Sequence, residues 1–410
     1  MQKYLVGGAV RDRLLNIEVK DRDWVVVGVT PKQMLDAGYQ QVGADFPVFL
    51  HPENGEEYAL ARTERKSGRG YNGFICDASP DISIEDDLAR RDLTINAIAE
   101  DENGDLIDPW GGLNDLNNKV LRHVSPAFSE DPLRVLRAAR FAARFAHLGF
   151  KIAPETSELM QQMSLSGELI ELTPERVFGE LEKALCSQTP RAFFEVLRKT
   201  KALAEILPEL DRLWGIPNPV KWHPEIDTGL HTMLVLEQIC LLNDKPEVRF
   251  AALCHDFGKA KTDPKYWPSH PGHEKAGVAV IEALAERIPL PNRYLSLAKL
   301  ASEYHCHLHK VTELRPSTLL KLFNRFDVWR KAERFEHFLD VCEADARGRT
   351  GLEDRPYPQK DYMKKALSEV QSVSARSFVE AGYQGAQIKQ QMEQARLEKL
   401  KQLKVSWQSQ

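Results

Sequence analysis

Two aspartates, Asp21 and Asp23, flank Arg22 directly before the apolar run from Trp24 to Val27. On a strand, both carboxylates would lie on one face about 7 Å apart, at a rise of roughly 3.3 Å per residue. Carboxylates so placed can hold one or two divalent ions, and ions about 3.5–4 Å apart serve phosphoryl transfer. The pattern indicates nucleotide chemistry. A plain loop that ends before a buried strand is the alternative.

A glycine pair lies just upstream of these carboxylates. Lys3 to Val6 predicts a short strand, Gly7-Gly8 a tight turn, and Ala9 to Leu15 a helix. Glycine lets backbone N–H groups approach an anion, and a helix N-terminus favours phosphate. Glycine pairs occur in many turns, so the pair alone is a weak signal. Together with the carboxylates it predicts a cradle for a triphosphate.

A basic segment begins with Arg90, Arg91 and Asp92 and continues as an amphipathic stretch to Ala97. The planar guanidinium donates two parallel hydrogen bonds to phosphate, which favours a ligand-binding role for the arginines. An ordinary charged helix cap is the alternative.

The pattern of another basic segment, Ser129 to Arg144, predicts a helix that Ser129 caps at its N-terminus. Its arginines are spaced three, three and four apart and form one stripe at about 100° per residue. They are Arg134, Arg137, Arg140 and Arg144. The segment contains no acid after Asp131, which favours a ligand-facing stripe over a solvated helix face. Asp131 and Arg134 could present an acceptor and donors to a base edge.

In the second half, the adjacent pair His255-Asp256 is the most informative feature, with His231, His273 and Asp345 also in helical segments. An imidazole and a carboxylate from one turn can share a divalent ion with ligands from neighbouring helices, leaving a position for a hydrolytic water. A single helical histidine is more often a surface or core residue. The adjacent pair therefore carries the inference of a second metal site.

These segments imply an α+β chain. Short apolar strands with turns dominate up to about Trp110, and the period is helical nearly throughout after Ser129. Breaks are expected at Leu172 to Pro174, which caps a new helix, and at Gly215 to Pro219, a linker. The length of 410 residues predicts two to four domains.

Composition excludes several classes of protein. Hydrophobic residues make up 42% and charged residues 28%, which is typical of a globular protein. No apolar run approaches the length of a membrane span, and the N-terminus lacks the pattern of a signal peptide. A cytoplasmic location is therefore expected. The six cysteines have no paired spacing, which argues against a disulfide framework or a zinc knuckle. With a net charge of −5, any site for a polyanion must concentrate its basic groups locally.

Four blocks, LVGGAVRD, DRD, RRDLTINA and EDPLRVLRAARF, together resemble the class II, bacterial-type CCA-adding tRNA nucleotidyltransferases, over roughly the first half of the chain. The segments around His255-Asp256 and Gly272 to Gly277 resemble an HD phosphohydrolase domain. The resemblance implies a polymerase-beta-type head with a mixed sheet, followed by all-helical regions. The implied domains are a head (1–128), a helical neck and body for base and tRNA binding (129–216), an HD domain (217–345) and a helical tail (346–410).

The same resemblance implies roles in the first half. Asp21 and Asp23 would bind catalytic Mg²⁺, Asp92 would meet the ribose, and two further sets would hold the triphosphate and read the base. These sets are Gly8, Arg11 and Arg91, and Asp131, Arg134, Arg137 and Arg140. The tRNA 3′ hydroxyl would attack the α phosphorus of CTP or ATP, releasing pyrophosphate. A loop such as Arg62 to Gly73 assists the switch from C to A in similar enzymes, which favours addition of the full CCA terminus.

For the HD segment, the resemblance implies that His231, His255, Asp256 and Asp345 bind Mg²⁺, Mn²⁺ or Ni²⁺. His273, and His305 or His307, would lie nearby. The implied activities are those of a phosphatase, a 2′-nucleotidase and a 2′,3′-cyclic phosphodiesterase. The partners would be tRNA, CTP and ATP, with no membrane, and a monomer and a homodimer both stay open.

Three alternative functions share some of these features. A bacterial poly(A) polymerase shares the head motifs but should have a more basic tail and no HD segment. A non-catalytic RNA-binding protein on this fold has no need of Asp21 and Asp23. A guanosine-tetraphosphate synthetase-hydrolase joins the same two activities in the opposite order.

Overall fold

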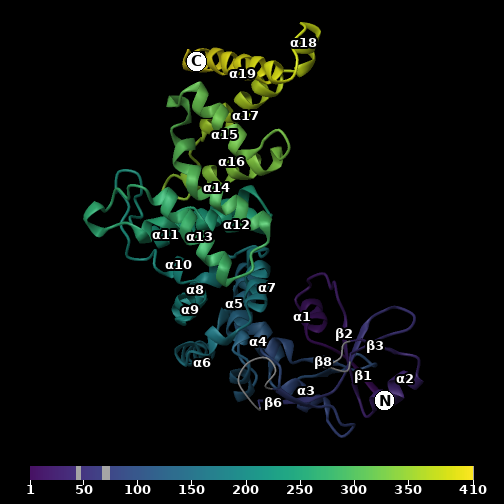
Figure 1. Cartoon of the computed structure of the whole chain (residues 1–410). Helices are drawn as coiled ribbons and strands as arrows, with labels where there is room; N and C mark the ends of the chain where they lie inside the picture. The colour runs from purple at the N-terminus through teal and green to yellow at the C-terminus, as the bar shows by residue number, and fades with distance from the viewer. Residues whose placement is uncertain (43–47, 67–73, 410) are drawn as a thin grey trace. The chain divides into compact units, whose positions relative to one another are not determined.

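The structure, a computed structural model, describes residues 1–42, 48–66 and 74–409. The chain divides into two compact units, Met1–Leu207 and Pro208–Gln410 (Figure 1). Among the described residues every strand belongs to the first unit. Residues 67–73, most of the loop expected to assist the C-to-A switch, lie outside the described residues.

A seven-stranded mixed sheet forms the framework of the first unit. Its order is β3 (Gln40–Val42), β4 (Val48–Leu50), β5 (Glu57–Leu60), β2 (Asp23–Val27), β1 (Gln2–Val6), β8 (Ala99–Glu100) and β9 (Leu106–Ile107). Side chains alternate between the faces of a strand. Accordingly, Val25 belongs to one core cluster with Tyr4 and Val6, and Val26 to another with Phe49 and Leu60. The expected α+β class and mixed-sheet head are confirmed.

The end of β1 lies beside the start of β2, two neighbouring strands in the interior of the sheet. The two strands are antiparallel and pair Val6 with Asp23. After Val6, Gly7 adopts a φ of 66° and helix α1 (Gly8–Leu14) begins. A side chain at Gly7 would be strained there, and its Cβ would lie 2.9 Å from Arg91 Nη1.

Strand β2 begins at Asp23, so Asp21 precedes it and the expectation of both aspartates on one strand is wrong. Pairing of β2 with β1 starts at Asp23 because Gly7 turns the chain away after Val6, and pairing with β5 starts at Asp23 opposite Glu57, the first residue of β5. Asp21 therefore lacks the ladder that would align it with Asp23.

The arginine-rich helix α5 covers Leu133–Phe145, so the expected start at Ser129 is also wrong. Ser129 lies in a short 3₁₀ helix, Pro126–Glu130. The Asp131 carboxylate accepts a hydrogen bond from the backbone N–H of Leu133 at 3.0 Å and satisfies one of the free amides at the start of α5. Asp131, rather than Ser129, therefore supplies a side-chain hydrogen bond to the first turn of α5, whose N-cap residue is Pro132.

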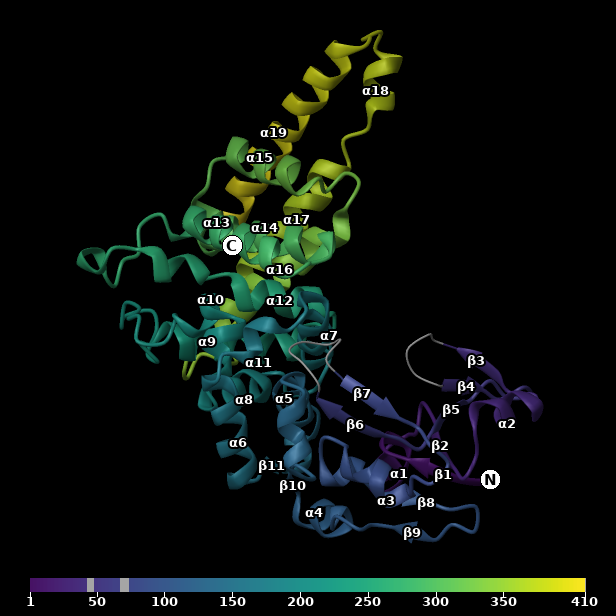
Figure 2. The same cartoon turned by 60° about the horizontal axis from the view of Figure 1, so that its bottom comes forward.

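Helices and two small strand pairs complete the first unit. The helices are α2 (Pro31–Asp36), α3 (Ile84–Ala89), α4 (Gly112–Asn118), α6 (Pro154–Leu165), α7 (Pro174–Leu185), α8 (Arg191–Lys199) and α9 (Ala202–Ile206). The strand pairs are β6 (Thr63–Lys66) with β7 (Phe74–Asp77), and β10 (Val120–Leu121) with β11 (Lys151–Ile152). Helix α5 packs against α7 and α8, and β6 and β7 lie side by side (Figure 2).

Helices make up the second unit as the structure describes it. They are α10 (Pro208–Asp211), α11 (Thr228–Leu242), α12 (Pro246–Cys254), α13 (His273–Arg287), α14 (Asn292–His309), α15 (Pro316–Phe326), α16 (Ala332–Arg347), α17 (Pro358–Gln371), α18 (Ala375–Glu380) and α19 (Ala386–Gln408). Helices α11, α12, α14 and α16 pack together, and α19 lies along α15 and α17. In the described part of the chain, no helix combines the length and apolar character needed to cross a membrane.

The expected linker, Gly215 to Pro219, is bonded into this second unit. The backbone N–H of Gly215 donates to Asp227 Oδ2 at 2.6 Å, and the N–H of Thr228 donates to the Ile216 carbonyl at 2.9 Å. These bonds fasten the segment to the start of α11.

Candidate functional site

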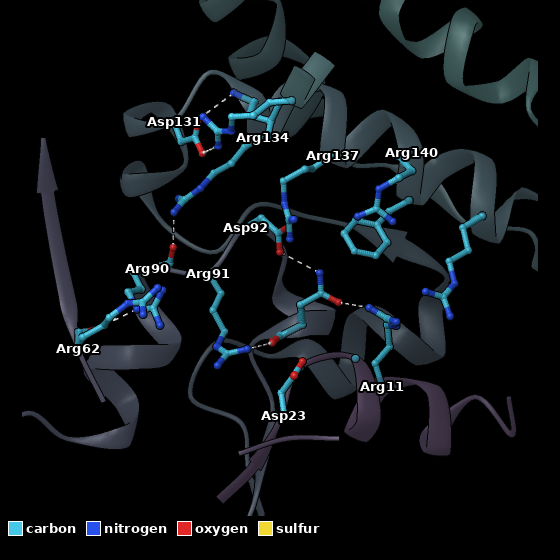
Figure 3. Close-up of a pocket in the computed structure, with 17 residues that line it drawn as sticks. Arg11, Asp23, Arg62, Arg90, Arg91, Asp92, Asp131, Arg134, Arg137 and Arg140 are labelled. Carbon is cyan, nitrogen blue, oxygen red and sulfur yellow. Dashed lines mark hydrogen bonds and ion pairs between the residues drawn. The ribbon is translucent and has the colours of Figure 1, made fainter. Parts of the chain in front are cut away.

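A pocket of about 540 Å³ in the first unit collects most of the predicted residues of the head (Figure 3). Nine arginines and three aspartates line it. They are Arg11, Arg62, Arg90, Arg91, Arg134, Arg137, Arg140, Arg144 and Arg176, with Asp23, Asp92 and Asp131. Nine guanidiniums thus line one cavity of an acidic chain, which suits a polyanion such as a triphosphate.

Asp23 enters this pocket from the start of β2, and Gly7 and Gly8 line it at the start of α1. Desolvation of the carboxyl raises the pKa of Asp23, Arg91 opposes the rise, and the charge of Asp21 adds to it. Asp21 is not among the described lining residues, but its charge reaches Asp23. The carboxylate of Asp23 supplies the hard oxygen donors that suit Mg²⁺.

Arg11 and Arg91 are held in place by buried partners. Arg11, on α1, is buried and donates from Nε to Asp12 Oδ1 at 2.8 Å and from Nη1 to Asn96 Oδ1. Arg91 donates from Nη2 to Asp87 Oδ2 at 3.1 Å, and Asp87 is fully buried on α3. Both guanidiniums are fixed before any ligand arrives, which lowers the ordering cost of binding an anion.

Asp92 lies at the centre of the pocket's hydrogen-bond network. Its Oδ2 accepts from Arg137 Nε at 2.8 Å, and its Oδ1 accepts from Asn96 Nδ2 at 2.8 Å. Figure 3 shows Arg137 directed at Asp92 from α5. Burial alone would raise the pKa of Asp92, but Arg137 and Asn96 hold it well below its usual value.

The arginine stripe of α5 lines the pocket, and acids from other elements neutralise it. Arg137 pairs with Asp92, Arg140 with Glu180 on α7, and Arg144 with Asp12 on α1. Arg134 differs, because it donates to the backbone carbonyls of Ala127 at 2.7 Å and Arg90 at 2.6 Å. Asp131 accepts from Arg176 Nη2 at 2.8 Å.

Sequence reasoning missed the partners that hold these groups. They are Asp12, Asp87, Asn96, Arg176 and Glu180. Asn96 lies within the block RRDLTINA, but nothing in a lone asparagine signals that its amide bridges Arg11 and Asp92.

The second unit brings the four residues of the predicted metal site together. His231 Nε2 lies 3.2 Å from Asp345 Oδ1, and His255 Nε2 lies 3.2 Å from Asp256 Oδ2 and 4.0 Å from Asp345 Oδ1. All four side chains are buried. They come from α11, the end of α12 and α16, so three separate helices converge on one point.

The orientation of the two histidines fits a divalent ion at this point. His231 Nδ1 lies 2.9 Å from the Gly348 carbonyl, and His255 Nδ1 lies 2.7 Å from the Ala252 carbonyl. An imidazole that donates from Nδ1 to a carbonyl presents Nε2 as a lone pair, the usual state of a metal-binding histidine. His255 Nε2 and Asp256 Oδ1 are buried without a hydrogen-bond partner among the described residues. The donors therefore suit a metal ion.

Further groups line a cavity of about 640 Å³ beside these residues. His273 Nε2 and His305 Nε2 lie 3.6 Å and 3.5 Å from Asp256 Oδ1, as expected for neighbours of the metal site. His307 is exposed on α14 and does not line the cavity as described, because it points away from the side of α14 that carries His305.

Three groups around the cavity had no signal in the sequence. Lys259 Nζ donates to Asp256 Oδ2 at 2.6 Å, and His309 Nε2 lies 2.6 Å from Asp345 Oδ2. Cys306 Sγ lies 3.3 Å from His305 Nε2. Burial alone would raise the pKa of Cys306, but His305 and His273 lower it to about 5.

Comparison with protein families gives three matches along the chain. Residues 3–122 match a family described as the poly A polymerase head domain. Residues 149–213 match a family described as a probable RNA and SrmB-binding site of polymerase A, and residues 228–346 match the HD domain. The first match contains Asp23, Arg91 and Asp92 of the first pocket, and the third contains all four residues of the predicted metal site.

Among individual proteins, the chain is 58% identical over 404 residues to a multifunctional CCA protein of Hahella chejuensis (strain KCTC 2396), covering 98% of this chain and 96% of that protein. Its fold resembles a CCA-adding enzyme solved with CTP, at a TM-score of 0.65, 22% identity and coverage of 97% and 87%. It also resembles a Thermotoga maritima CCA-adding enzyme complexed with tRNA, at a TM-score of 0.62, 21% identity and coverage of 99% and 91%.

Proposed function

The chain belongs to the multifunctional CCA protein family, and we propose that its first unit adds C, C and A to the 3′ end of tRNA from CTP and ATP without a nucleic-acid template. We further propose that its second unit is a metal-dependent phosphohydrolase. The chain is thus an enzyme with two separate sites. A cytoplasmic location is part of the same proposal.

In the first unit, Asp21 and Asp23 would hold Mg²⁺, which when bound activates the attacking hydroxyl and neutralises charge on the phosphates. Gly8, Arg11 and Arg91 would hold the triphosphate. Arg11 and Arg91 already have fixed directions through Asn96 and Asp87, so they would bind without rearrangement. Asp92 would accept a hydrogen bond from the ribose, since Arg137 and Asn96 keep it ionised.

Base selection would rest on Asp131, Arg134, Arg137 and Arg140. The two carbonyl contacts of Arg134 fix the plane of its guanidinium, and Arg176 fixes the carboxylate of Asp131. A rigid acceptor beside a rigid donor fork can match one hydrogen-bonding edge and reject another, because a wrong edge leaves a buried polar group unpaired. The protein would thereby replace a template.

In the second unit, His231, His255, Asp256 and Asp345 would hold Mg²⁺, Mn²⁺ or Ni²⁺, which when bound supplies an activated water for attack on phosphorus. Lys259 and Arg349 line the cavity and would bind the phosphate of a monoester or a 2′,3′-cyclic phosphate. His309 would keep Asp345 oriented through its 2.6 Å contact with Oδ2.

One observation carries the proposal for the first unit: Asp23 and nine arginines line the same pocket. The test is incorporation of labelled CTP and ATP into tRNA that lacks its last three nucleotides. Addition of two C and one A, followed by a stop, supports the proposal. A poly(A) polymerase would instead extend the primer with a run of A.

A further inference from the structure

We propose that Trp222 is a stacking platform for a nucleobase in the cavity of the second unit, so that the site selects nucleotides over phosphate esters that lack a base. The proposal rests on the hydrolase function proposed above, and it names the part of the substrate that the cavity would recognise besides the phosphate.

Trp222 is unusually exposed for its residue type. Tryptophan side chains are highly buried on average, yet Trp222 is 52% exposed. The residue lines the same cavity of about 640 Å³ as Asp256 and Asp345 of the predicted metal site. An aromatic ring buries a large apolar area when a flat ligand stacks on it. The indole of Trp222 is therefore available to a ligand that also reaches the metal site.

The segment that carries Trp222 is fastened to the metal site on its N-terminal side. Asn218 Oδ1 accepts a hydrogen bond from Lys259 Nζ at 2.9 Å, and the same Nζ donates to Asp256 Oδ2 at 2.6 Å. A tight turn follows, in which the backbone N–H of Trp222 donates to the Pro219 carbonyl at 2.9 Å. These bonds relate the position of the indole to that of the Asp256 carboxylate.

The segment is also fastened on the C-terminal side of Trp222. Glu225 Oε1 lies 3.0 Å from His223 Nδ1 and 2.9 Å from His231 Nδ1. His231 is itself one of the predicted metal ligands, so Trp222 stands between two attachments to the site. A platform that is ordered before the ligand arrives lowers the ordering cost of binding.

The surroundings of the indole are apolar and rigid. Pro219, Pro268 and Pro356, from three separate segments, line the cavity together with Trp222. Proline has no backbone N–H to satisfy, which suits it to an apolar wall. Lys221 Nζ lies over the Trp222 ring at 4.6 Å from its centroid, a cation–π contact that occupies one face. A base stacked on the other face would leave this contact intact.

The cavity also supplies groups for the phosphate of the same ligand. Lys259, Lys310 and Arg349 line it, with the carboxylate of Glu313 as an opposing charge. Arg349 Nε is buried and has no hydrogen-bond partner among the described residues, so it can donate to a phosphate oxygen. Cationic donors and an apolar rim within one cavity match the two ends of a nucleotide.

The test compares two substrates of the full chain that carry the same scissile group and differ in the base. They are 2′,3′-cyclic AMP and 1-O-methylribose 2′,3′-cyclic phosphate. The parent should have the lower KM for 2′,3′-cyclic AMP. Trp222→Ala should raise this KM about 5- to 150-fold, the factor that corresponds to stacking of one base, and leave the KM of the base-free substrate unchanged.

Two further variants show whether the effect belongs to the ring. Trp222→Phe should keep most of the preference for the base, because a phenyl ring still stacks. Trp110→Ala, at an exposed position in the first unit, is the control and should match the parent. Equal KM values for both substrates in the parent, or an equal rise for both in Trp222→Ala, would overturn the proposal.

A binding measurement separates this proposal from the hydrolase function, since it requires no turnover. Saturation-transfer NMR is recorded for 2′-AMP with the chelator-treated full chain. The adenine protons should receive less saturation from Trp222→Ala than from the parent or Trp110→Ala. If the parent hydrolyses neither substrate while this difference persists, the hydrolase proposal fails and the platform stands. Equal adenine signals with the parent and Trp222→Ala would overturn the platform.

Discussion

Arg137 contacts Asp92 through both Nε and Nη2, at 2.8 and 2.7 Å from the same carboxylate oxygen. The pair joins α5 to the segment after α3, and Asp92 is buried while Arg137 lines the pocket. A basic stripe that appeared unpaired in sequence is therefore part of an ion-pair network. The network both stabilises the first unit and directs its donors.

This pair predicts how the first unit responds to acid. Because the folded-state pKa of Asp92 is depressed, its ionisation stabilises the fold fully above the ordinary aspartate pKa of about 3.9, and this contribution is lost as the pH falls below that value. Hydrogen exchange of the α5 amides should therefore lose protection more steeply with acid in the parent than in Asp92→Asn. Equal slopes in the two proteins would contradict the role of Asp92.

Asn96 should matter for nucleotide binding although it is proposed to contact no substrate. Asn96→Ala removes the amide between Arg11 and Asp92, and a hydrogen bond to a charged group contributes about 1.5–3 kcal/mol. We expect kcat/KM for both CTP and ATP to fall by about 10- to 100-fold. Asn118→Ala, at an exposed position on α4, is the control. Parent-like kinetics for Asn96→Ala would exclude a positioning role.

Arg134 should control base choice, and a lysine should not replace it. Lysine cannot donate to both the Ala127 and Arg90 carbonyls as a planar fork does. Arg134→Lys should lose about 1–3 kcal/mol of discrimination, measured as incorporation of GTP and UTP into tRNA lacking its final A. Arg198→Lys, exposed on α8, serves as control. If Arg134→Lys still refuses GTP and UTP at normal rates of C and A addition, Arg134 is structural.

In the second unit, His309 and Tyr357 should tune the metal site. His309 contacts Asp345 Oδ2 through Nε2, and Tyr357 Oη contacts its Nδ1. Loss of such an outer partner typically weakens metal affinity or activity about 10- to 100-fold. We expect His309→Ala to show this loss in metal titrations and in hydrolysis of 2′,3′-cyclic AMP, with Tyr357→Phe less affected. Tyr383→Phe, at an exposed site, is the control and should match the parent. Unchanged metal affinity in His309→Ala would count against a role of His309 in orienting Asp345.

The sequence predicted the features that depend on local pattern. Helical and strand periods indicated the mixed-sheet head and the helices that follow, and motifs identified Asp23, Arg91 and Asp92 as pocket residues. Local pattern also misled, because Ser129 resembles an N-cap while α5 begins four residues later and Asp131 bonds its first amide. Strand alternation placed Asp21 on β2, whereas the ladder ends where Gly7 turns the neighbouring strand away.

Contacts between distant segments could not be predicted from one sequence. Arg144 pairs with Asp12 across 132 positions, and Arg140 pairs with Glu180 across 40. Cys306 gave no signal for the same reason, since its partner His273 lies on another helix. Only the packing of α13 against α14 brings them together.

The central claim is that one chain carries two chemically independent sites, and a crossed comparison of two variants tests it most directly. CCA addition to truncated tRNA and hydrolysis of 2′,3′-cyclic AMP are measured for the parent, Asp23→Ala and His255→Ala. We predict that Asp23→Ala abolishes addition and keeps hydrolysis, and that His255→Ala abolishes hydrolysis and keeps addition. Loss of both activities in either correctly folded variant, or addition by Asp23→Ala at the parent rate, would contradict the account.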